Sequence, residues 1–282
     1  MPVITEYRHG ATAGIPPTVN SHPRAPRSEC AGWSESSTRR NTRFLYSVDE
    51  SKLNGHGFAL SLTIRDIPPT AAEFHKIRRA FLKRLERLGM FRCHWLIEWQ
   101  RRKAPHIHAA VWFPDYDGIN PDAIRCEIVR HWIEASQGNP LTSVRGQSVK
   151  PISDSVGWFK YLSKHAVRGL GHYQRSPENI PPGWQGRTGR MWGHLGQWDL
   201  TGPVRYLVGQ DAFWKYRRMV RAWRLADARA ASSSYRIKSA RGMLRCHDRA
   251  LSECRGVSEW IPRDMTAALV ALLAAQGHEV RC

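Results

Sequence analysis

Two histidines, His106 and His108, flank a single isoleucine inside the apolar stretch from Pro105 to Phe113. Alternate residues of a β-strand point to the same face of a sheet, so the two imidazoles can share one cation. In a chain with 13 histidines this triplet also arises by chance, and two surface histidines on a strand would give the same pattern. The pair therefore indicates a metal site only if neighbouring residues add to it.

A carboxylate lies in the apolar stretch just before the histidines, residues 91–99. Glu98 shares a strand face there with His94 and Gln100. Residues 100–105 form a basic turn, and a hairpin folded about this turn brings Glu98 beside the histidine pair. His94 or Gln100 can take the same place, so the identity of the third ligand stays open among these residues.

Two imidazoles and a carboxylate leave open coordination positions for a phosphate oxygen and for water. Such a ligand set suits Mg²⁺ or Mn²⁺ in a nuclease, and it also suits Fe²⁺ in an oxygenase or Zn²⁺ in a hydrolase. Arg101, Arg102 and Lys103 lie in the turn beside the site. These cations favour a substrate that contains phosphate, and we expect them to contact DNA.

Tyr161 and Lys164 lie three residues apart in a segment predicted to be helical, which begins near residues 154–155 and ends at Gly169. Residues three apart share a helical face, so Lys164 can stabilise a phenolate at Tyr161. A phenol, with a pKa of about 10, attacks phosphorus poorly unless a cation assists it. In the alternative interpretation, Tyr161 packs in the core beside Trp158 and Lys164 lies in solvent.

A sheet with helices must bring these residues together, and apolar periodicity predicts six elements. They are, in order, a strand at 57–64, a helix at 70–89, strands at 91–99 and 106–113, a helix at 120–138 and a strand at 149–152. Thr70 and Glu73 have capping-box spacing at the start of the first helix. This order predicts a ferredoxin-like or RRM-like α+β domain over residues 55–200, with helices on one face of an antiparallel sheet and the other face open for ligands.

The two ends of the chain differ from this domain. Residues 1–54 are rich in Pro, Ser, Thr, Gly and Arg without apolar periodicity, which predicts a flexible basic arm. Residues 201–282 are predicted to form a basic helical region. No G-x-x-x-x-G-K-[ST] motif occurs, so the sequence gives no ground for an ATPase or helicase domain.

The charge of the chain favours a polyanionic partner. There are 43 Lys and Arg against 24 Asp and Glu, a formal net charge of +19, which favours nucleic acid. The six cysteines show no metal-binding or disulfide spacing. No apolar run is long enough to span a membrane or to serve as a signal peptide, so we expect a cytoplasmic protein without a membrane partner.

The segment between Gly171 and Trp198 is dense in Gly, Pro, Trp and Arg. Its aromatic and guanidinium groups can stack on unpaired bases or contact phosphates. In the alternative interpretation, the tryptophans pack a loop-rich lid over the sheet. The DNA-binding residues expected here are Trp184, Arg187, Arg190 and Trp192.

Together these residues resemble the HUH endonuclease superfamily, and within it the rolling-circle replication initiators of plasmids and filamentous phages. The resemblance covers about residues 57 to 200 and rests on three motifs in order: the apolar strand at 58–64, the His-hydrophobic-His at 106–108 and the Y-x-x-K at 161–164. It implies the HUH nuclease fold, a Mg²⁺ or Mn²⁺ held by His106, His108 and Glu98, and Tyr161 as nucleophile.

The resemblance also predicts what the protein does. Position 165 is a histidine and the next tyrosine is Tyr173, whereas some relatives carry two tyrosines about four residues apart, so a single catalytic tyrosine is expected. The expected function is an initiator that nicks single-stranded or hairpin origin DNA in a bacterial host through a covalent phosphotyrosine, and that depends on a host helicase and polymerase. The alternatives are a conjugative relaxase, a single-strand transposase, or a non-enzymatic protein that binds single-stranded nucleic acid.

Overall fold

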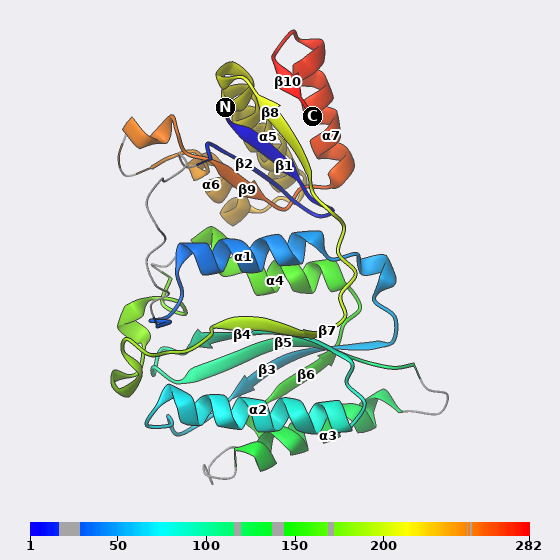
Figure 1. The fold of residues 1–282 in the computed structure, drawn as a ribbon, viewed down its shortest axis with the longest axis vertical. Coiled ribbons are helices and arrows are strands. Elements are labelled where there is room, and N and C mark those ends of the chain that lie inside the picture. Colours follow the sequence, from blue (N-terminus) through cyan, green and yellow to red (C-terminus); the bar gives the residue numbers. More distant parts are fainter. Residues whose placement is uncertain (17–28, 116–119, 137–143, 169–171, 247, 249) are drawn as a thin grey trace. The chain divides into compact units, whose positions relative to one another are not determined.

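The computed structural model describes residues 1–16, 29–115, 120–136, 144–168, 172–246, 248 and 250–282, and it confirms an α+β fold. The described residues form two antiparallel sheets of five strands each (Figure 1). The chain divides into two compact units. We call Pro26–Leu45 with Asp49–Asp199 the central unit, and Met1–Ala25 with Tyr46–Val48 and Leu200–Cys282 the terminal unit.

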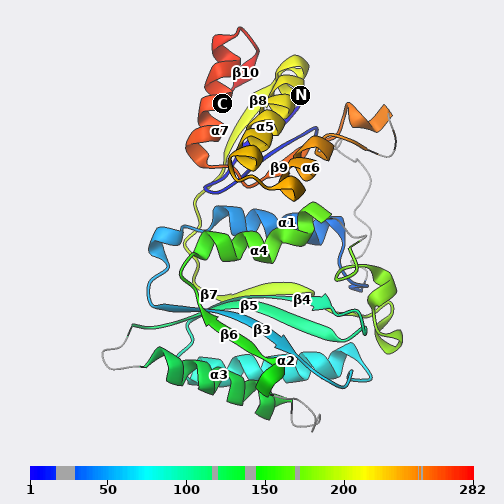
Figure 2. The same cartoon turned by 180° about the vertical axis from the view of Figure 1, so that it is seen from behind.

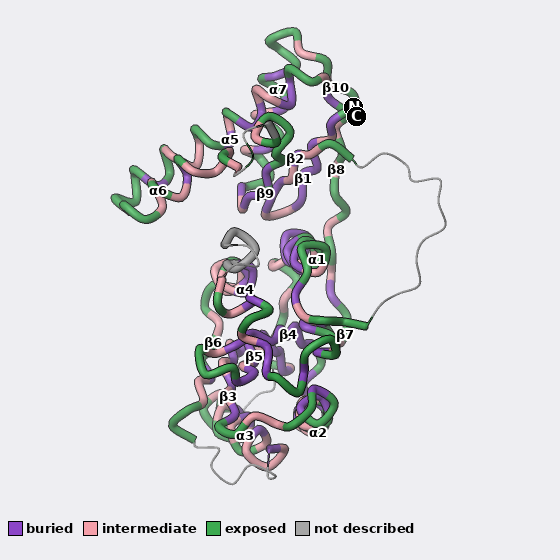
Figure 3. Tube along the Cα trace, turned by 90° about the vertical axis from the view of Figure 1, so that its left-hand side faces the viewer, coloured by how far each residue is buried: buried purple, intermediate pink, exposed green. Residues whose placement is uncertain are grey.

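The sheet of the central unit has the strand order β6-β3-β5-β4-β7, with all neighbours antiparallel. Its strands are β3 (His56–Thr63), β4 (Arg92–Trp99), β5 (Pro105–Phe113), β6 (Ser148–Pro151) and β7 (Trp192–Gly196). The first four of these in the chain adopt the split order of a ferredoxin-like unit, as the sequence predicts. β7 extends this sheet beside β4, which is buried along its whole length (Figure 3).

One face of this sheet is covered by α2 (Ala71–Arg87) and α3 (Pro121–Ala135) (Figure 2). The predicted capping box is present, because Thr70 accepts from the backbone of Glu73 and Glu73 accepts from the backbone of Thr70. Gly89 follows the helix at a φ of 103°, the left-handed conformation that favours glycine. Phe74 and Phe81 of α2 are buried against the sheet, so this face holds the apolar core of the unit.

The opposite face carries α1 (Glu35–Ser47) and α4 (Ser155–Arg168) (Figure 1), whereas the sequence predicts helices on one face only. In α1 the buried positions Thr38, Asn41, Thr42 and Leu45 have helical spacing, yet three of them are polar. This helix therefore has no apolar periodicity in the sequence that would predict it. The side chain of Asn41 shows why the inner side is polar, since it lies 2.8 Å from Nε2 of the buried His94.

Short 3-10 helices complete the central unit, at Glu50–Lys52, Val144–Gly146, Pro177–Asn179 and Pro182–Trp184.

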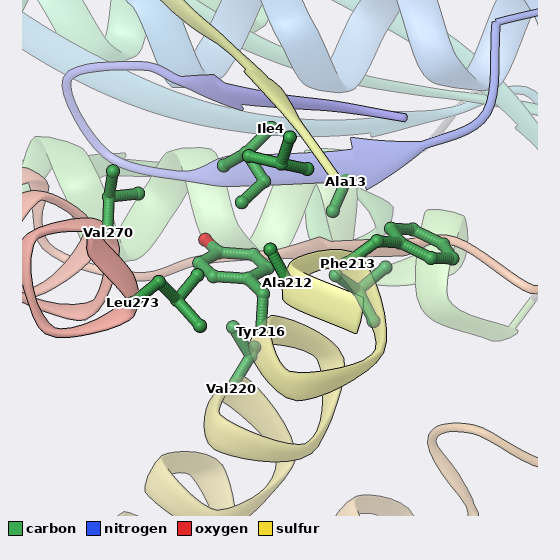
Figure 4. Close-up of a cluster of buried hydrophobic side chains, with 10 residues drawn as sticks. Ile4, Ala13, Ala212, Phe213, Tyr216, Val220, Val270 and Leu273 are labelled. Carbon is green, nitrogen blue, oxygen red and sulfur yellow. The ribbon is translucent and has the colours of Figure 1, made fainter. Parts of the chain in front are cut away.

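The terminal unit has a sheet of order β10-β8-β1-β2-β9 with three helices. Its elements are β1 (Val3–Glu6), β2 (Ala11–Gly14), β8 (Val204–Val208), α5 (Gln210–Ala230), α6 (Ser234–Gly242), a 3-10 helix (Ala250–Ser252), β9 (Val257–Glu259), α7 (Arg263–Ala275) and β10 (Val280–Arg281). Ile4 of β1, Tyr216 of α5 and Leu273 of α7 meet in one apolar cluster (Figure 4). The C-terminal region thus supplies strands as well as the expected helices.

The described part of residues 1–54 differs from the expected flexible arm. β1 pairs with β2 on one side and with β8 on the other, where Val3 lies opposite Leu207. The strands are only four residues long, too short for a periodic signal, and β8 lies about 200 residues away in sequence. Because its order depends on these distant contacts, the local composition of residues 1–54 does not reveal it. None of the helices in the described ranges is long and apolar enough to cross a membrane.

We expect Ile4→Ala to destabilise the terminal unit by about 2–5 kcal/mol, because it removes a fully buried side chain from the cluster between β1 and α5. Urea unfolding followed by circular dichroism measures the loss. Ile15→Ala is the matched control: Ile15 is 46% exposed, and its truncation should change stability by no more than about 0.5 kcal/mol. An equal effect of the two substitutions would mean that β1 does not pack as described.

Candidate active site

Strand register brings the predicted metal ligands to one face of the central sheet. Glu98 of β4 lies opposite His106 of β5, and Ser61 of β3 lies opposite His108. The rings of the two histidines are 4.5 Å apart, centroid to centroid, at an angle of 83°. This is the face covered by α1 and α4, so the hairpin predicted from the sequence unites the three residues as expected.

His108 is held by contacts on both sides of its ring. Its Nδ1 lies 2.8 Å from the hydroxyl of Ser61, and its Nε2 lies 3.5 Å from Oε2 of Glu98. If Nδ1 carries the proton and donates it to Ser61, Nε2 is the basic nitrogen on the side of Glu98. Both His108 and Glu98 are buried, at 3% and 1% exposure. These polar side chains are therefore buried on one face of the sheet.

The two alternatives for the third ligand lie in different places. His94 packs among aromatic rings, with Phe44 stacked on it at 5.6 Å, and burial lowers the pKa of His94 to about 3. Gln100 lies at the edge of the site, with Nε2 at 3.5 Å from Nδ1 of His106. Glu98 is the carboxylate that approaches His108, and so it is the best candidate of the three.

Tyr161 of α4 lies against the histidines. Its ring centroid is 5.3 Å from that of His108, and the ring also stacks on Trp158 at 4.7 Å. Burial, then the Glu98 carboxylate, then Tyr173 raise the pKa of Tyr161 above that of a free phenol. The phenol is therefore protonated at neutral pH unless a nearby positive charge opposes this effect. The predicted helix is present. The stack on Trp158 is the contact that the alternative interpretation expects, so the catalytic role of Tyr161 stays a prediction.

Lys164 belongs to α4, one helical turn after Tyr161. Its side chain lies outside the described residues, so its assistance to Tyr161 stays a prediction.

Arg175 contacts the carboxylate oxygen of Glu98 that does not face His108. Its Nε and Nη2 each lie 3.5 Å from Oε1 of Glu98, its Nη1 lies 3.4 Å from the hydroxyl of Thr38, and its guanidinium lies over the ring of Trp33. The sequence gives no signal for this contact, because Arg175 is far from Glu98 in the chain and belongs to no motif. Ser61 is different: it is a polar residue between Leu60 and Leu62, so strand alternation alone assigns it to the face of the histidines.

The types of the candidate ligands suit a divalent cation, but their side chains are not yet close enough together to bind one. Within the described ranges, no three His, Cys, Asp or Glu side chains are grouped as a metal site. Two imidazoles and a carboxylate nevertheless converge, and the contact between Ser61 and His108 is the kind that orients a ligating histidine. His106, His108 and Glu98 could therefore hold the cation after small side-chain movements.

The basic turn joins β4, which carries Glu98, to β5, which carries the two histidines. Arg101, Arg102 and Lys103 are all exposed. Arg102 donates to the carbonyl oxygens of Ile64 and Arg65, which holds its guanidinium against the end of β3. The expected contact of these cations with DNA is compatible with their exposure and stays a prediction.

Trp184 is placed differently from the expectation. It is 0% exposed, its indole nitrogen donates to the carbonyl oxygen of Pro68 at 2.8 Å, and its ring packs on Trp99. It is a core residue and cannot stack on a base, so the alternative of a packed lid is correct for this residue. Arg190 is exposed, as is Arg187, which pairs with Glu29 at 2.7 Å.

Trp192 of β7 is half-buried, tilted against Phe44 at a centroid distance of 6.1 Å. Part of its surface remains accessible, so stacking of a base on it stays a prediction.

Relatives of the chain are replication proteins. The family model described as replication-associated protein ORF2/G2P matches residues 57–166. The chain is 48% identical over 286 residues to a "putative replication protein" of Xylella fastidiosa strain 9a5c, and 46% identical over 285 residues to the replication-associated protein G2P of Pseudomonas phage Pf3. Each of these alignments covers 99% of both chains. No solved structure matches the chain.

We expect Trp184→Ala to lower the free energy of unfolding by about 3–5 kcal/mol, because it leaves a cavity beside Trp99. Phe91→Ala is the control within the same unit, since Phe91 is 39% exposed and its loss should cost distinctly less. Chemical denaturation compares the two. Trp184→Phe keeps most of the core volume, and its affinity for a single-stranded oligonucleotide should equal that of the wild type. A clear loss of affinity in this folded variant would restore a DNA-binding role for Trp184.

Proposed function

The chain belongs to the family of replication-associated proteins ORF2/G2P, and from this membership we propose that it starts rolling-circle replication by nicking one strand of origin DNA. The observation that carries the proposal is the contact between Tyr161 and His108, whose rings are 5.3 Å apart, beside the carboxylate of Glu98. A candidate nucleophile and three candidate metal ligands thus lie close together. Such an arrangement suits phosphoryl transfer to a tyrosine.

The reaction transfers a phosphodiester from DNA to the protein. The phenol oxygen of Tyr161 attacks the phosphorus in line, the bond from phosphorus to the 3′ oxygen breaks, and the 5′ phosphate stays esterified to Tyr161. The phenol loses its proton to solvent, and the leaving oxygen takes up a proton to become a free 3′ hydroxyl. A host polymerase can extend this end, and we expect a host helicase to unwind the duplex.

The residues around Tyr161 have separate tasks in this reaction. The stack on Trp158 fixes the direction of the phenol ring. His106, His108 and Glu98 would hold Mg²⁺ or Mn²⁺, which when bound polarises the phosphate and stabilises its charge. Lys164 is expected to stabilise the developing phenolate. Burial and Glu98 raise the pKa of Tyr161, so the phenol stays protonated until positive charge is brought beside it.

The DNA strand is expected to reach the site along exposed cations. Arg101, Arg102 and Lys103 lie in the turn next to His106, and Arg187 and Arg190 are also exposed. The net charge of +19 favours any polyanion, and contacts of this kind bind without reading sequence.

We expect Tyr161→Phe to bind DNA nearly as the wild type does and to form no covalent adduct, because it keeps the ring and removes the attacking oxygen. A single-turnover reaction with an oligonucleotide labelled 3′ of the nick, separated on a denaturing gel, measures the label that moves with the protein. Tyr173→Phe, at the nearest other tyrosine in the sequence, should form the adduct normally. Full activity of Tyr161→Phe would refute the assignment of the nucleophile, and nicking with two free ends would indicate hydrolysis by water. Binding without any cleavage would favour the non-enzymatic alternative.

We expect Ser61→Ala to raise the Mn²⁺ concentration needed for half-maximal nicking by about 10- to 100-fold, because it removes the partner that orients His108. A titration of nicking rate against Mn²⁺ measures this shift. Ser148→Ala is the matched control, since Ser148 is paired with Ser61 across β3 and β6, and it should leave the titration unchanged. The double variant His106→Ala with His108→Ala, or excess chelator, should abolish nicking. Undiminished nicking in chelator would exclude a divalent cation from the reaction.

A further inference from the structure

Arg175 and Glu98 form an ion pair deep inside the central unit. The side chains are 0% and 1% exposed, and two nitrogens of the guanidinium lie 3.5 Å from the same carboxylate oxygen, Oε1. Burial of two opposite charges costs several kcal/mol for each ion, and apolar residues in their place often stabilise a protein equally well or better. Stability alone is therefore a poor reason for this pair.

The guanidinium is fixed by parts of the chain far apart in sequence. It lies 3.9 Å from the centre of the Trp33 ring, and Nη1 lies 3.4 Å from the hydroxyl of Thr38 in α1. Its own backbone amide donates to the carbonyl oxygen of His172 at 2.8 Å. Burial lowers the pKa of Arg175 to about 10, with Glu98 acting in the opposite direction, so the group keeps its charge at neutral pH.

The same segments also hold the backbone of β4 on both sides of Glu98. The indole nitrogen of Trp33 donates to the carbonyl oxygen of Ile97 at 2.8 Å. The amide of Trp99 donates to the carbonyl oxygen of Gln174, the neighbour of Arg175, also at 2.8 Å. The backbone before Glu98, the backbone after it and one of its carboxylate oxygens are thus fixed together.

We propose that Arg175 is a positioning residue, which holds Oε1 of Glu98 so that Oε2 faces His108 and the cation. This inference rests on the function proposed above, because it concerns the same cation. Oε2 lies 3.5 Å from Nε2 of His108, while the guanidinium lies beside Oε1. Glu98 then offers the cation a single oxygen in a fixed direction.

The charge of Arg175 makes the proposal testable by the sign of an effect. A positive charge beside a cation site weakens cation binding by repulsion, so its removal alone would tighten binding. Loss of the orientation of Glu98 has the opposite effect, since removal of a residue that orients a metal ligand typically weakens binding about 10- to 100-fold. A positioning role therefore predicts weaker binding in spite of the lost charge.

The experiment measures Mn²⁺ binding to the full-length protein without DNA, from the electron paramagnetic resonance signal of free Mn²⁺. We expect Arg175→Met to raise the dissociation constant about 10- to 100-fold. Arg92→Met is the matched control, because Arg92 is a second buried arginine; it begins β4, at the end of the strand away from Glu98, and pairs with Asp199. The dissociation constant of Arg92→Met for Mn²⁺ should stay within about twofold of the wild-type value, because the lost charge is remote from the cation site. Unchanged or tighter binding in Arg175→Met would overturn the proposal.

Two further measurements separate the possible failures. If circular dichroism shows that Arg175→Met does not fold, Arg175→Lys takes its place, because lysine keeps the charge and lacks the planar fork, and it should also bind Mn²⁺ more weakly. Adduct formation by the wild type tests the proposed function independently. If the wild type forms the adduct and Arg175→Met binds Mn²⁺ as tightly as the wild type does, the positioning role alone is refuted. Absence of Mn²⁺ binding by the wild type would refute the positioning role and the metal ligands together.

Discussion

The pairing of β5 with its two neighbours fixes which side chains meet beneath α4. With β4 it sets Glu98 opposite His106, and with β3 it sets Ser61 opposite His108. Side chains alternate between the faces of a sheet, so a shift of β5 by one residue would turn both imidazoles toward α2. Ile107, which packs on that apolar side, would move to the polar side. The apolar core under α2 thus maintains the geometry of the candidate site on the opposite face.

The face beneath α1 and α4 carries several buried polar side chains, and these side chains contact one another. His94 lies against Asn41, His108 lies between Ser61 and Glu98, and Arg175 lies beside Glu98. Buried polar groups need such partners, because the loss of water is otherwise uncompensated. A network of this kind keeps each side chain in one orientation. The polar inner side of α1 is therefore part of what supports the site.

The elements that could be predicted from the sequence are those set by short-range patterns, such as apolar periodicity, helix caps and turn residues. The capping box at Thr70, the hairpin about residues 100–105 and the strand order of the ferredoxin-like unit follow from periodicity and turn residues, and the hairpin brings Glu98 beside the two histidines. The remainder depends on contacts between distant segments. Trp184 could not be assigned to the core, because its neighbours in the sequence are rich in Gly, Pro, Trp and Arg. Neither α1 nor the contact of Arg175 with Glu98 gives a recognisable pattern in the sequence.

The pairing of β1 with β8 also sets an order of events during synthesis. Val3 lies opposite Leu207, so β1 leaves the ribosome about 200 residues before its partner. At about 5–20 residues per second, this delay is on the order of 10–40 s. The whole central unit lies between these two strands in the chain, so it can fold before β8 is synthesised and pairs with β1. During that time β1 and β2 expose unpaired edges, and a nascent chain at this stage is open to aggregation or to binding by chaperones.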